Sequence, residues 1–265
     1  MSTLRLATAQ FPVCGDIARN LRYMVDLLEQ GKREKVDIVH FSEACLGGYA
    51  GGDFKSWDGH DWGMLQDAED QLRRLAGKLA IGIVYGTNRR VTDDDVRNSL
   101  IYVSPQGERA AEYDKRFCTG GDLKHYVAGQ RFATFELNGF ICGLLICYDV
   151  RFPELYREYK KLGVKVMCHS FYNARAKGKS IHTTIMRPTL QARAATNHMY
   201  VSGNNSSGYY QSWPSVFIVP DGTIAQSCRQ HRTELMVSDI NSEDVFYDAS
   251  GAYRERAMAG ILHSE

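Results

Sequence analysis

The 265-residue sequence lacks several features that mark whole classes of protein. Its 32 basic and 31 acidic residues nearly balance, and no block of one sign stands out, so nothing indicates a nucleic acid or an anionic membrane as a partner. No apolar run approaches the roughly 20 residues of a membrane span. The opening MSTLRLATAQFPV lacks the continuous apolar core of a signal peptide. We therefore expect a cytoplasmic protein without membrane or nucleic-acid partners.

Cysteine patterns that are typical of disulfide frameworks and metal sites are also missing. The seven cysteines include no C-x-x-C pair, and no histidine–cysteine cluster has the spacing of zinc ligands. The stretch GNNSSG at 203–208 lacks the lysine of a phosphate-binding P-loop. The sequence thus predicts reduced cysteines with mostly structural roles.

What the sequence does contain is an alternation of apolar, strand-length segments with amphipathic helical ones. The stretch DIARNLRYMVDLLEQG spaces its apolar residues for one helical face, and Asp16 and Gly31 are placed to begin and end that helix. The pair Asn138-Gly139 between two apolar runs predicts a hairpin. No repeat or linker interrupts the pattern, so we expect a single domain over residues 1–265, with helices covering mixed sheets.

Three apolar strands each end in a residue that can carry chemistry. DIVHFSE ends in Glu43, AAEYDKRF contains Lys115 and FICGLLIC ends in Cys147. Strand ends and the loops that follow them are where α/β proteins place their sites. Each residue is a weak signal by itself, because free cysteine is among the most buried residue types, and glutamate and lysine are common on surfaces.

Together, the three side chains supply the parts of an acyl-transfer site. A thiol reacts as its thiolate, which a nearby base or cation favours. Glutamate can take the thiol proton and pass it to a leaving amine, and lysine offers a fixed positive charge to a developing oxyanion. A papain-like pairing of Cys147 with His40 or His169 is a competing mechanism, although no local signature supports it.

The segments around these residues resemble the signatures of the nitrilase superfamily, the carbon–nitrogen hydrolases. FSEACLGGY, EYDKRF and LLICYDVRFPELYR occur in the order found in that family. The later stretches QARAATNHMYVSGNNSSG and SVFIVPDGTIAQS also fit, so the resemblance covers essentially the whole chain. The form Cys-Tyr-Asp-x-Arg-Phe-Pro-Glu is most similar to the ω-amidase-like branch.

The resemblance implies an α/β fold, a four-layer α-β-β-α sandwich of two mixed sheets, assembled as a homodimer or higher homo-oligomer through its outer helices. It also implies Glu43 as general base, Lys115 as oxyanion stabiliser and Cys147 as nucleophile. The backbone N–H of Tyr148 would complete the oxyanion hole. Neither a metal nor an organic cofactor is expected.

Three positions depart from the family pattern. Ser42 stands where proline usually precedes the catalytic glutamate, and Thr196 replaces a glutamate of the Ala-Arg-Ala helix, so a buried salt bridge there is missing or replaced. Asp122 occupies the position of a second glutamate and is a possible fourth acid, one methylene shorter. These departures keep open an alternative of another class, a catalytically poor binding protein on the same scaffold.

Indications of the substrate are fewer. The stretch HSFYNARAKGKS contains Arg175 and Lys177, which suit an amide with a distal carboxylate, although an ordinary solvated loop has the same composition. Tyr49 and Phe171 are candidates for packing beside the acyl chain. We predict hydrolysis of a small linear amide with release of ammonia, and an N-carbamoyl amine hydrolase or a nitrilase on the same three residues as the alternative.

Overall fold

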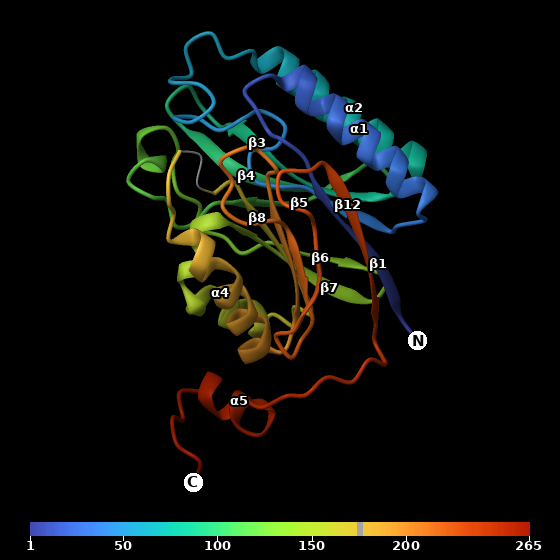
Figure 1. The fold of residues 1–265 in the computed structure, drawn as a ribbon, viewed down its shortest axis with the longest axis vertical. Coiled ribbons are helices and arrows are strands. Elements are labelled where there is room, and N and C mark those ends of the chain that lie inside the picture. Colours follow the sequence, from blue (N-terminus) through green and yellow to red (C-terminus); the bar gives the residue numbers. More distant parts are fainter. Residues whose placement is uncertain (174–176) are drawn as a thin grey trace.

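The structure is a computed structural model that describes residues 1–173 and 177–265. Within these residues, two six-stranded sheets face each other, and helices cover both outer faces (Figure 1). The layers therefore follow the order helix, sheet, sheet, helix. This arrangement confirms the predicted α/β fold, a four-layer α-β-β-α sandwich of two mixed sheets.

The first sheet provides the strand ends that carry Glu43 and Lys115. Its strands, in spatial order, are β12 (Glu234–Asn241), β1 (Thr3–Gln10), β2 (Ile38–His40), β3 (Gly82–Arg90), β4 (Val96–Val103) and β5 (Arg109–Asp114). The central strands β1, β2 and β3 are parallel, and the other strands pair antiparallel with their neighbours. The outer face is covered by helices α1 (Ile17–Arg33) and α2 (Trp62–Leu79).

The second sheet carries Cys147. Its strands, in spatial order, are β11 (Ile224–Ser227), β10 (Val216–Ile218), β9 (Tyr200–Asn205), β8 (Val166–Phe171), β7 (Phe140–Ile146) and β6 (Thr134–Leu137). Strands β7, β8 and β9 are parallel, and the remaining pairs are antiparallel. Two short 3₁₀ helices lie near the strand ends, η1 (Asp122–Lys124) and η2 (Cys147–Arg151).

The helices of the second half complete the layers. Helices α3 (Pro153–Lys161) and α4 (His182–Asn197) cover the second sheet, whereas α5 (Gly251–Met258) lies in a C-terminal segment that extends away from both sheets (Figure 1). In the part of the chain that the structure describes, every helix is too short or too polar to cross a bilayer.

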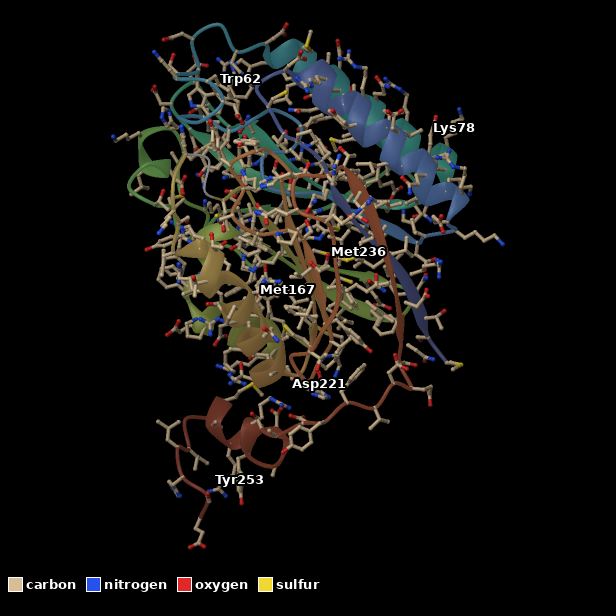
Figure 2. The ribbon with its side chains drawn as sticks, in the orientation of Figure 1. Trp62, Lys78, Met167, Asp221, Met236 and Tyr253 are labelled. Carbon is tan, nitrogen blue, oxygen red and sulfur yellow. The ribbon has the colours of Figure 1, made fainter. Side chains whose placement is uncertain are left out.

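Buried apolar side chains form two cores, one on each face of the first sheet. One core joins that sheet to α1 and α2 and includes Leu28 and Val39. The other fills the space between the sheets and beneath α3 and α4, where Met167 lies among the strands (Figure 2). Strands β7 and β8 are covered on both faces, which accounts for their nearly continuous apolar sequences. Lys78 of α2 and Tyr253 of α5 are exposed at the periphery (Figure 2).

The predicted start of the first helix is confirmed, but its predicted end is wrong. Asp16 caps α1 by accepting a hydrogen bond from the N–H of Arg19 at 2.9 Å. The helix then continues past Gly31 and ends at Arg33. Gly31 is buried within the last turn and packs against Val36, so the glycine serves a close contact rather than a helix stop.

The predicted hairpin turn is confirmed between β6 and β7. Asn138 and Gly139 have φ values of 51° and 81°, which are the left-handed values that a two-residue hairpin turn of type I′ requires. Leu137 and Phe140 pair directly across this turn. The turn thereby sets the register in which β7 enters the second sheet.

Candidate active site

Cys147 lies where β7 ends and η2 begins. Its backbone φ is +46°, in the left-handed region that residues other than glycine rarely adopt, so the chain turns sharply at this residue. Its side chain is partly exposed and lines a cavity of about 600 Å³. The strained turn therefore presents a thiol to the cavity at the end of an otherwise buried strand.

Asp149 holds this turn in place. Its carboxylate accepts hydrogen bonds from the Ile146 N–H at 3.1 Å, the Phe117 N–H at 2.9 Å and the Tyr113 hydroxyl at 2.7 Å. Burial raises the pKa of Asp149 to about 6, and these donors limit the rise because they favour the ionised form. Since Tyr113 and Phe117 flank Lys115, the carboxylate also ties the turn to the segment that carries the lysine.

Lys115 lies between two buried carboxylates. Its Nζ is 3.0 Å from Oε1 of Glu43 and 2.9 Å from Oδ2 of Asp122, and these three side chains are at most 1% exposed. Asp122 also accepts hydrogen bonds from the Tyr49 hydroxyl and, at 2.8 Å, from the Thr119 N–H. Asp122 is one methylene shorter than the glutamate of the family pattern, but its carboxylate still contacts Lys115.

The charges of this cluster stabilise one another. Burial by itself lowers the pKa of Lys115, but nearby negative groups, with Glu43 first among them, outweigh burial and raise that pKa well above its ordinary value. Burial likewise raises the pKa of Asp122, but Lys115 outweighs it and holds that pKa below its ordinary value. At neutral pH Lys115 is therefore a cation and Asp122 an anion.

The Cys147 thiol is protonated at neutral pH in the free site. Burial raises its pKa, and the negative charges of Glu43 and Asp122 raise it further against the opposing effect of Lys115. Such a thiol needs a base that takes its proton as it reacts. Oε2 of Glu43 is buried and accepts no hydrogen bond from any described residue, so this oxygen is free to act as an acceptor.

Two asparagines that the sequence analysis missed complete the surroundings of these side chains. Asn98 of β4 donates to Oε1 of Glu43 at 2.8 Å, and Asn173, which follows β8, donates to Sγ of Cys147 at 3.1 Å. Asn98 stands between Arg97 and Ser99 in the polar first half of β4, so the sequence does not single it out. Nothing in the sequence distinguishes Asn173 from its polar neighbours.

The cavity beside Cys147 contains two of the predicted substrate contacts. Tyr49 and Lys177 both line it. Arg175, the other predicted basic contact, lies outside the described residues. Tyr148 follows Cys147 in the first turn of η2, and the leading backbone N–H groups of such a turn have no carbonyl partner inside the helix.

The prediction that Phe171 packs beside the acyl chain is wrong. Its side chain is fully buried, and its ring centroid lies 4.9 Å from that of Trp213 in an edge-on contact. Successive side chains of a strand point to opposite faces, so Tyr172, the next residue, lines the cavity instead. The sequence pattern did not reveal which of the two faces the cavity.

The two histidines considered for a papain-like mechanism are not paired with the thiol. Both ring nitrogens of His40 bond serine hydroxyls, Ser202 and Ser170, each at 2.8 Å. Burial lowers the pKa of His40 to about 3, so its ring is neutral. His169 bonds the Tyr156 hydroxyl through Nδ1 at 2.7 Å, and its Nε2 has no partner among the described residues. Both rings are therefore buried structural groups.

The remaining departures from the family pattern have different local consequences. The side chain of Ser42 is fully buried, and its Oγ has no hydrogen-bond partner among the described residues. Thr196 lies exposed on α4, where its hydroxyl donates to the Ala192 carbonyl at 2.6 Å. Its own backbone carbonyl accepts a hydrogen bond at 3.0 Å from Arg254 of α5. At this position the described contacts of Thr196 are thus hydrogen bonds, one of them to the C-terminal helix.

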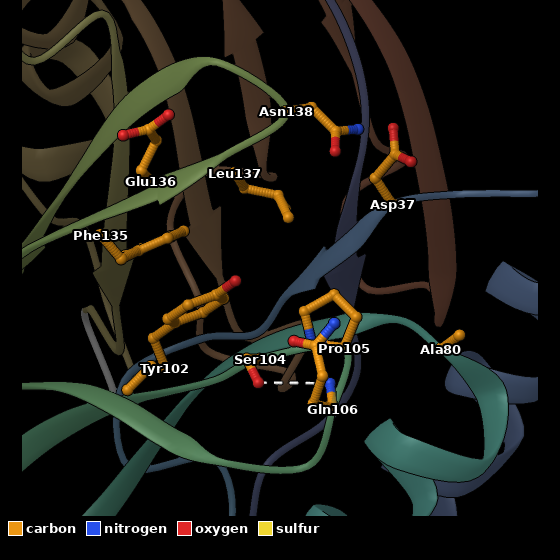
Figure 3. Close-up of a pocket in the computed structure, with 11 residues that line it drawn as sticks. Asp37, Ala80, Tyr102, Ser104, Pro105, Gln106, Phe135, Glu136, Leu137 and Asn138 are labelled. Carbon is orange, nitrogen blue, oxygen red and sulfur yellow. Dashed lines mark hydrogen bonds between the residues drawn. The ribbon is translucent and has the colours of Figure 1, made fainter.

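A second cavity, of about 510 Å³, lies between the β4–β5 connection and the β6–β7 hairpin (Figure 3). Tyr102 and Phe135 stack on its wall with ring centroids 3.6 Å apart. Its described lining includes the acids Asp37 and Glu136 but no cysteine, lysine or histidine. A thiol and a lysine, the side chains that acyl transfer would need, line the Cys147 cavity and not this one. Among the described residues, no group of three or more histidine, cysteine or acidic side chains is arranged to hold a metal ion.

Comparison with known proteins places the chain among hydrolases. The model of the carbon-nitrogen hydrolase family matches residues 5–246. The "Hydrolase in agr operon" of Staphylococcus aureus is 27% identical over 91% of this chain and 93% of its own length. The omega-amidase YafV of Yersinia enterocolitica is 27% identical over 98% of this chain and 96% of its own length.

Two further comparisons concern amidases. The 2-oxoglutaramate amidase of Bacillus subtilis is 30% identical over 145 residues, which is 54% of each chain. A crystal structure of an amidase from Nesterenkonia sp. superposes with a TM-score of 0.84 at 21% identity, over 98% of this chain and 97% of that one. At that identity the structural likeness establishes the fold.

Proposed function

This chain belongs to the carbon-nitrogen hydrolase family, and we propose that it is an ω-amidase-like member that hydrolyses a small linear amide and releases ammonia. The observation that carries this proposal is the position of Lys115, with Nζ 3.0 Å from Glu43 and 2.9 Å from Asp122, beside a cavity into which Cys147 opens. Nucleophile, base and fixed cation thus lie together.

In the proposed first step, the Cys147 sulfur attacks the amide carbonyl carbon while Oε2 of Glu43 takes the thiol proton. The electron pair of the carbonyl moves onto its oxygen. Lys115 and the backbone N–H of Tyr148 stabilise this oxyanion. The charge of Lys115 is present before the substrate arrives, so it needs no rearrangement as the oxyanion forms.

In the following steps, the oxyanion collapses and the carbon–nitrogen bond breaks. The leaving nitrogen takes the proton from Glu43 and departs as ammonia, which leaves a thioester on Cys147. Glu43, again a carboxylate, then removes a proton from a water molecule that attacks the thioester. The carbon–sulfur bond breaks, the sulfur of Cys147 takes that proton from Glu43, and the carboxylic acid product leaves.

We further propose that the substrate carries a carboxylate away from its amide. Lys177 and Lys179 line the cavity, and their ammonium groups suit an anionic group. The names of two relatives, omega-amidase and 2-oxoglutaramate amidase, support the same substrate class.

The decisive experiment measures ammonia release from a panel of 2-oxoglutaramate, succinamate, butyramide, N-carbamoyl amines and nitriles. Succinamate and butyramide are nearly matched in size and differ in the carboxylate, so a preference for succinamate supports an anionic substrate. An N-carbamoyl substrate would release carbon dioxide and an amine as well. Turnover confined to carbamoyl amines or nitriles would replace the amidase proposal with the corresponding alternative.

The Cys147→Ala variant tests the proposed nucleophile. We expect it to release no ammonia while its melting temperature stays close to that of the wild type, because the residue is partly exposed at a cavity. Cys142→Ala is the matched control, since it removes a thiol from the same strand at a fully buried position. Undiminished turnover by Cys147→Ala would refute the proposed mechanism.

A further inference from the structure

Asn173 contacts the sulfur of Cys147 and has no part in the mechanism above. Its Nδ2 donates to Sγ at 3.1 Å. Its Oδ1 accepts a hydrogen bond from Nε1 of Trp213 at 2.8 Å. An indole N–H can only donate, so the acceptor end of the Asn173 amide is fixed toward the tryptophan and the donor end toward the sulfur.

The surrounding residues hold this amide rigidly. Asn205 accepts a hydrogen bond from the backbone N–H of Asn173 at 3.2 Å and donates to the Trp213 carbonyl at 2.8 Å. Trp213 is 1% exposed, and Phe171 packs edge-on against its ring. Phe171, which does not touch the cavity, therefore supports the residue that orients Asn173.

We propose that Asn173 is a further catalytic residue whose N–H stabilises the negative charge of the Cys147 sulfur, and that Trp213 is the positioning residue that keeps this N–H directed at the sulfur. The proposal rests on the proposed function, in which that charge develops. The thiol proton passes to Glu43, and Asn173 keeps both of its own protons. As sulfur attacks, its electron pair forms the new bond to carbon, and the carbonyl oxygen takes up the charge.

The size of the effect follows from two opposing trends. Hydrogen bonds to an ionised partner are about twice as strong as neutral ones, so losing this donor should raise the thiol pKa by about one unit. Nucleophilicity rises with pKa with a Brønsted coefficient of about 0.4–0.5. A tenfold loss of thiolate is thus partly offset, and the net loss in reaction rate is about threefold at any pH below the thiol pKa.

The test measures alkylation of Cys147 by 4-vinylpyridine, a reagent that carries no amide group, between pH 6 and 9, followed by mass spectrometry of the Cys147 peptide. Asn173→Leu keeps the approximate size and removes the donor, and we expect alkylation to slow about threefold across this range. Trp213→Phe keeps an aromatic ring but removes the N–H, and we expect a smaller change in the same direction. Trp57→Phe, which loses an N–H bonded to the His125 carbonyl, should alkylate like the wild type.

Asn173→Gln restores the amide and should recover part of the rate. If Asn173→Leu is alkylated at the wild-type rate, the proposed role of Asn173 is overturned. If Trp213→Phe is alkylated at the wild-type rate, the positioning role of Trp213 is overturned. If Asn173→Leu does not fold, Asn173→Ala and Trp213→Phe decide the matter. Alkylation requires no amide substrate, so the two proposals can fail separately. If no amide is hydrolysed but Asn173→Leu slows alkylation as expected, only the proposed function is rejected. If amides are hydrolysed but Asn173→Leu alkylates at the wild-type rate, only this inference is rejected.

Discussion

At the scale of single residues, one buried cation is paired with two buried carboxylates. Lys115 lies between Glu43 and Asp122, and all three side chains are inaccessible to solvent or nearly so. An isolated buried charge is costly, whereas a buried charge with close partners of opposite sign is tolerated. Removing the cation should therefore affect folding as well as activity.

We expect Lys115→Met to lower the free energy of unfolding at pH 7.5 by about 3–5 kcal/mol, because it leaves two buried carboxylates without their partner. Burial, no longer outweighed by Lys115, would then raise the folded-state pKa of Asp122 above its value in the unfolded chain. The loss should accordingly shrink as the pH falls and Asp122 takes up a proton. Urea unfolding at pH 7.5 and pH 5 measures this, with the exposed Lys78→Met as control. An equal loss at both pH values would contradict the expectation.

The wild-type protein should show the opposite dependence on pH. Although burial opposes it, Lys115 holds the pKa of Asp122 below its ordinary value, so the contribution of this ion pair to stability is present above about pH 4. That contribution is lost as the pH falls further, through the folded-state pKa of Asp122. Asp122→Asn should weaken this part of the acid-induced loss of stability, as followed by urea unfolding between pH 5 and 2.5.

Lys177 provides a residue-scale test of substrate charge. If the Lys177 ammonium binds a distal carboxylate, Lys177→Gln should raise the KM for succinamate by roughly tenfold, because one charge-assisted hydrogen bond is lost. The KM for butyramide, which has no carboxylate, should stay unchanged. Lys78→Gln, on the outer face of α2, is the matched control (Figure 2). A similar change for both amides would indicate a general disturbance of the cavity instead.

At the scale of elements, strand β3 supports the loop that carries Glu43. A Cβ atom on Gly86 would lie 2.3 Å from the Ala44 nitrogen and 2.6 Å from the Ser42 carbonyl oxygen. Ala44 itself has a φ of +52°, so the chain turns tightly directly after Glu43. The missing side chain at Gly86 is what allows this turn to rest against the strand.

We expect Gly86→Ala to push the Glu43 turn away from β3 and to reduce kcat/KM for the best amide of the panel by at least about 100-fold, because a displacement near 1 Å can cost that much. Overpacking should also lower stability by about 1–3 kcal/mol. Gly120→Ala is the control, since a Cβ there meets nothing within 4 Å. Steady-state kinetics and thermal unfolding of both variants check this, and normal activity of Gly86→Ala would show that the turn is not so constrained.

At the scale of the whole molecule, the C-terminal segment exposes large apolar side chains to solvent. Val245, Tyr247 and Leu262 are 94%, 78% and 84% exposed, and the segment extends away from both sheets (Figure 1). Apolar side chains gathered on one segment are typical of a surface that another molecule covers. The homodimer or higher homo-oligomer implied by the family resemblance remains a prediction, and this segment is a suitable place to test it.

We expect the wild-type chain to sediment as a homodimer or a larger homo-oligomer, and Val245→Asp with Tyr247→Asp to shift the equilibrium toward the monomer, because each carboxylate would be buried unpaired in an interface. Tyr209→Asp, at an equally exposed tyrosine outside the segment, should have no effect. Sedimentation velocity over a range of protein concentrations separates these outcomes. A wild-type chain that remains monomeric at every concentration would refute the prediction.

The sequence by itself determined the local features of this protein. Strand and helix alternation, the Asp16 cap and the Asn138-Gly139 turn depend on neighbours in the chain, and neighbouring residues suffice to predict them. The sequence also marked Glu43 and Cys147 as chemically notable strand ends. Its resemblance to a family then supplied the sandwich, which periodicity alone left undecided between one sheet and two.

Only the tertiary structure decided which side chains meet. Glu43 and Lys115 come from the first sheet and Cys147 from the second, so their assembly depends on how two sheets pack. The contacts of Asn98 and Asn173 likewise join residues far apart in the chain. Phe171 was misplaced because the sequence of a strand that is buried on both faces does not say which side chains face the cavity.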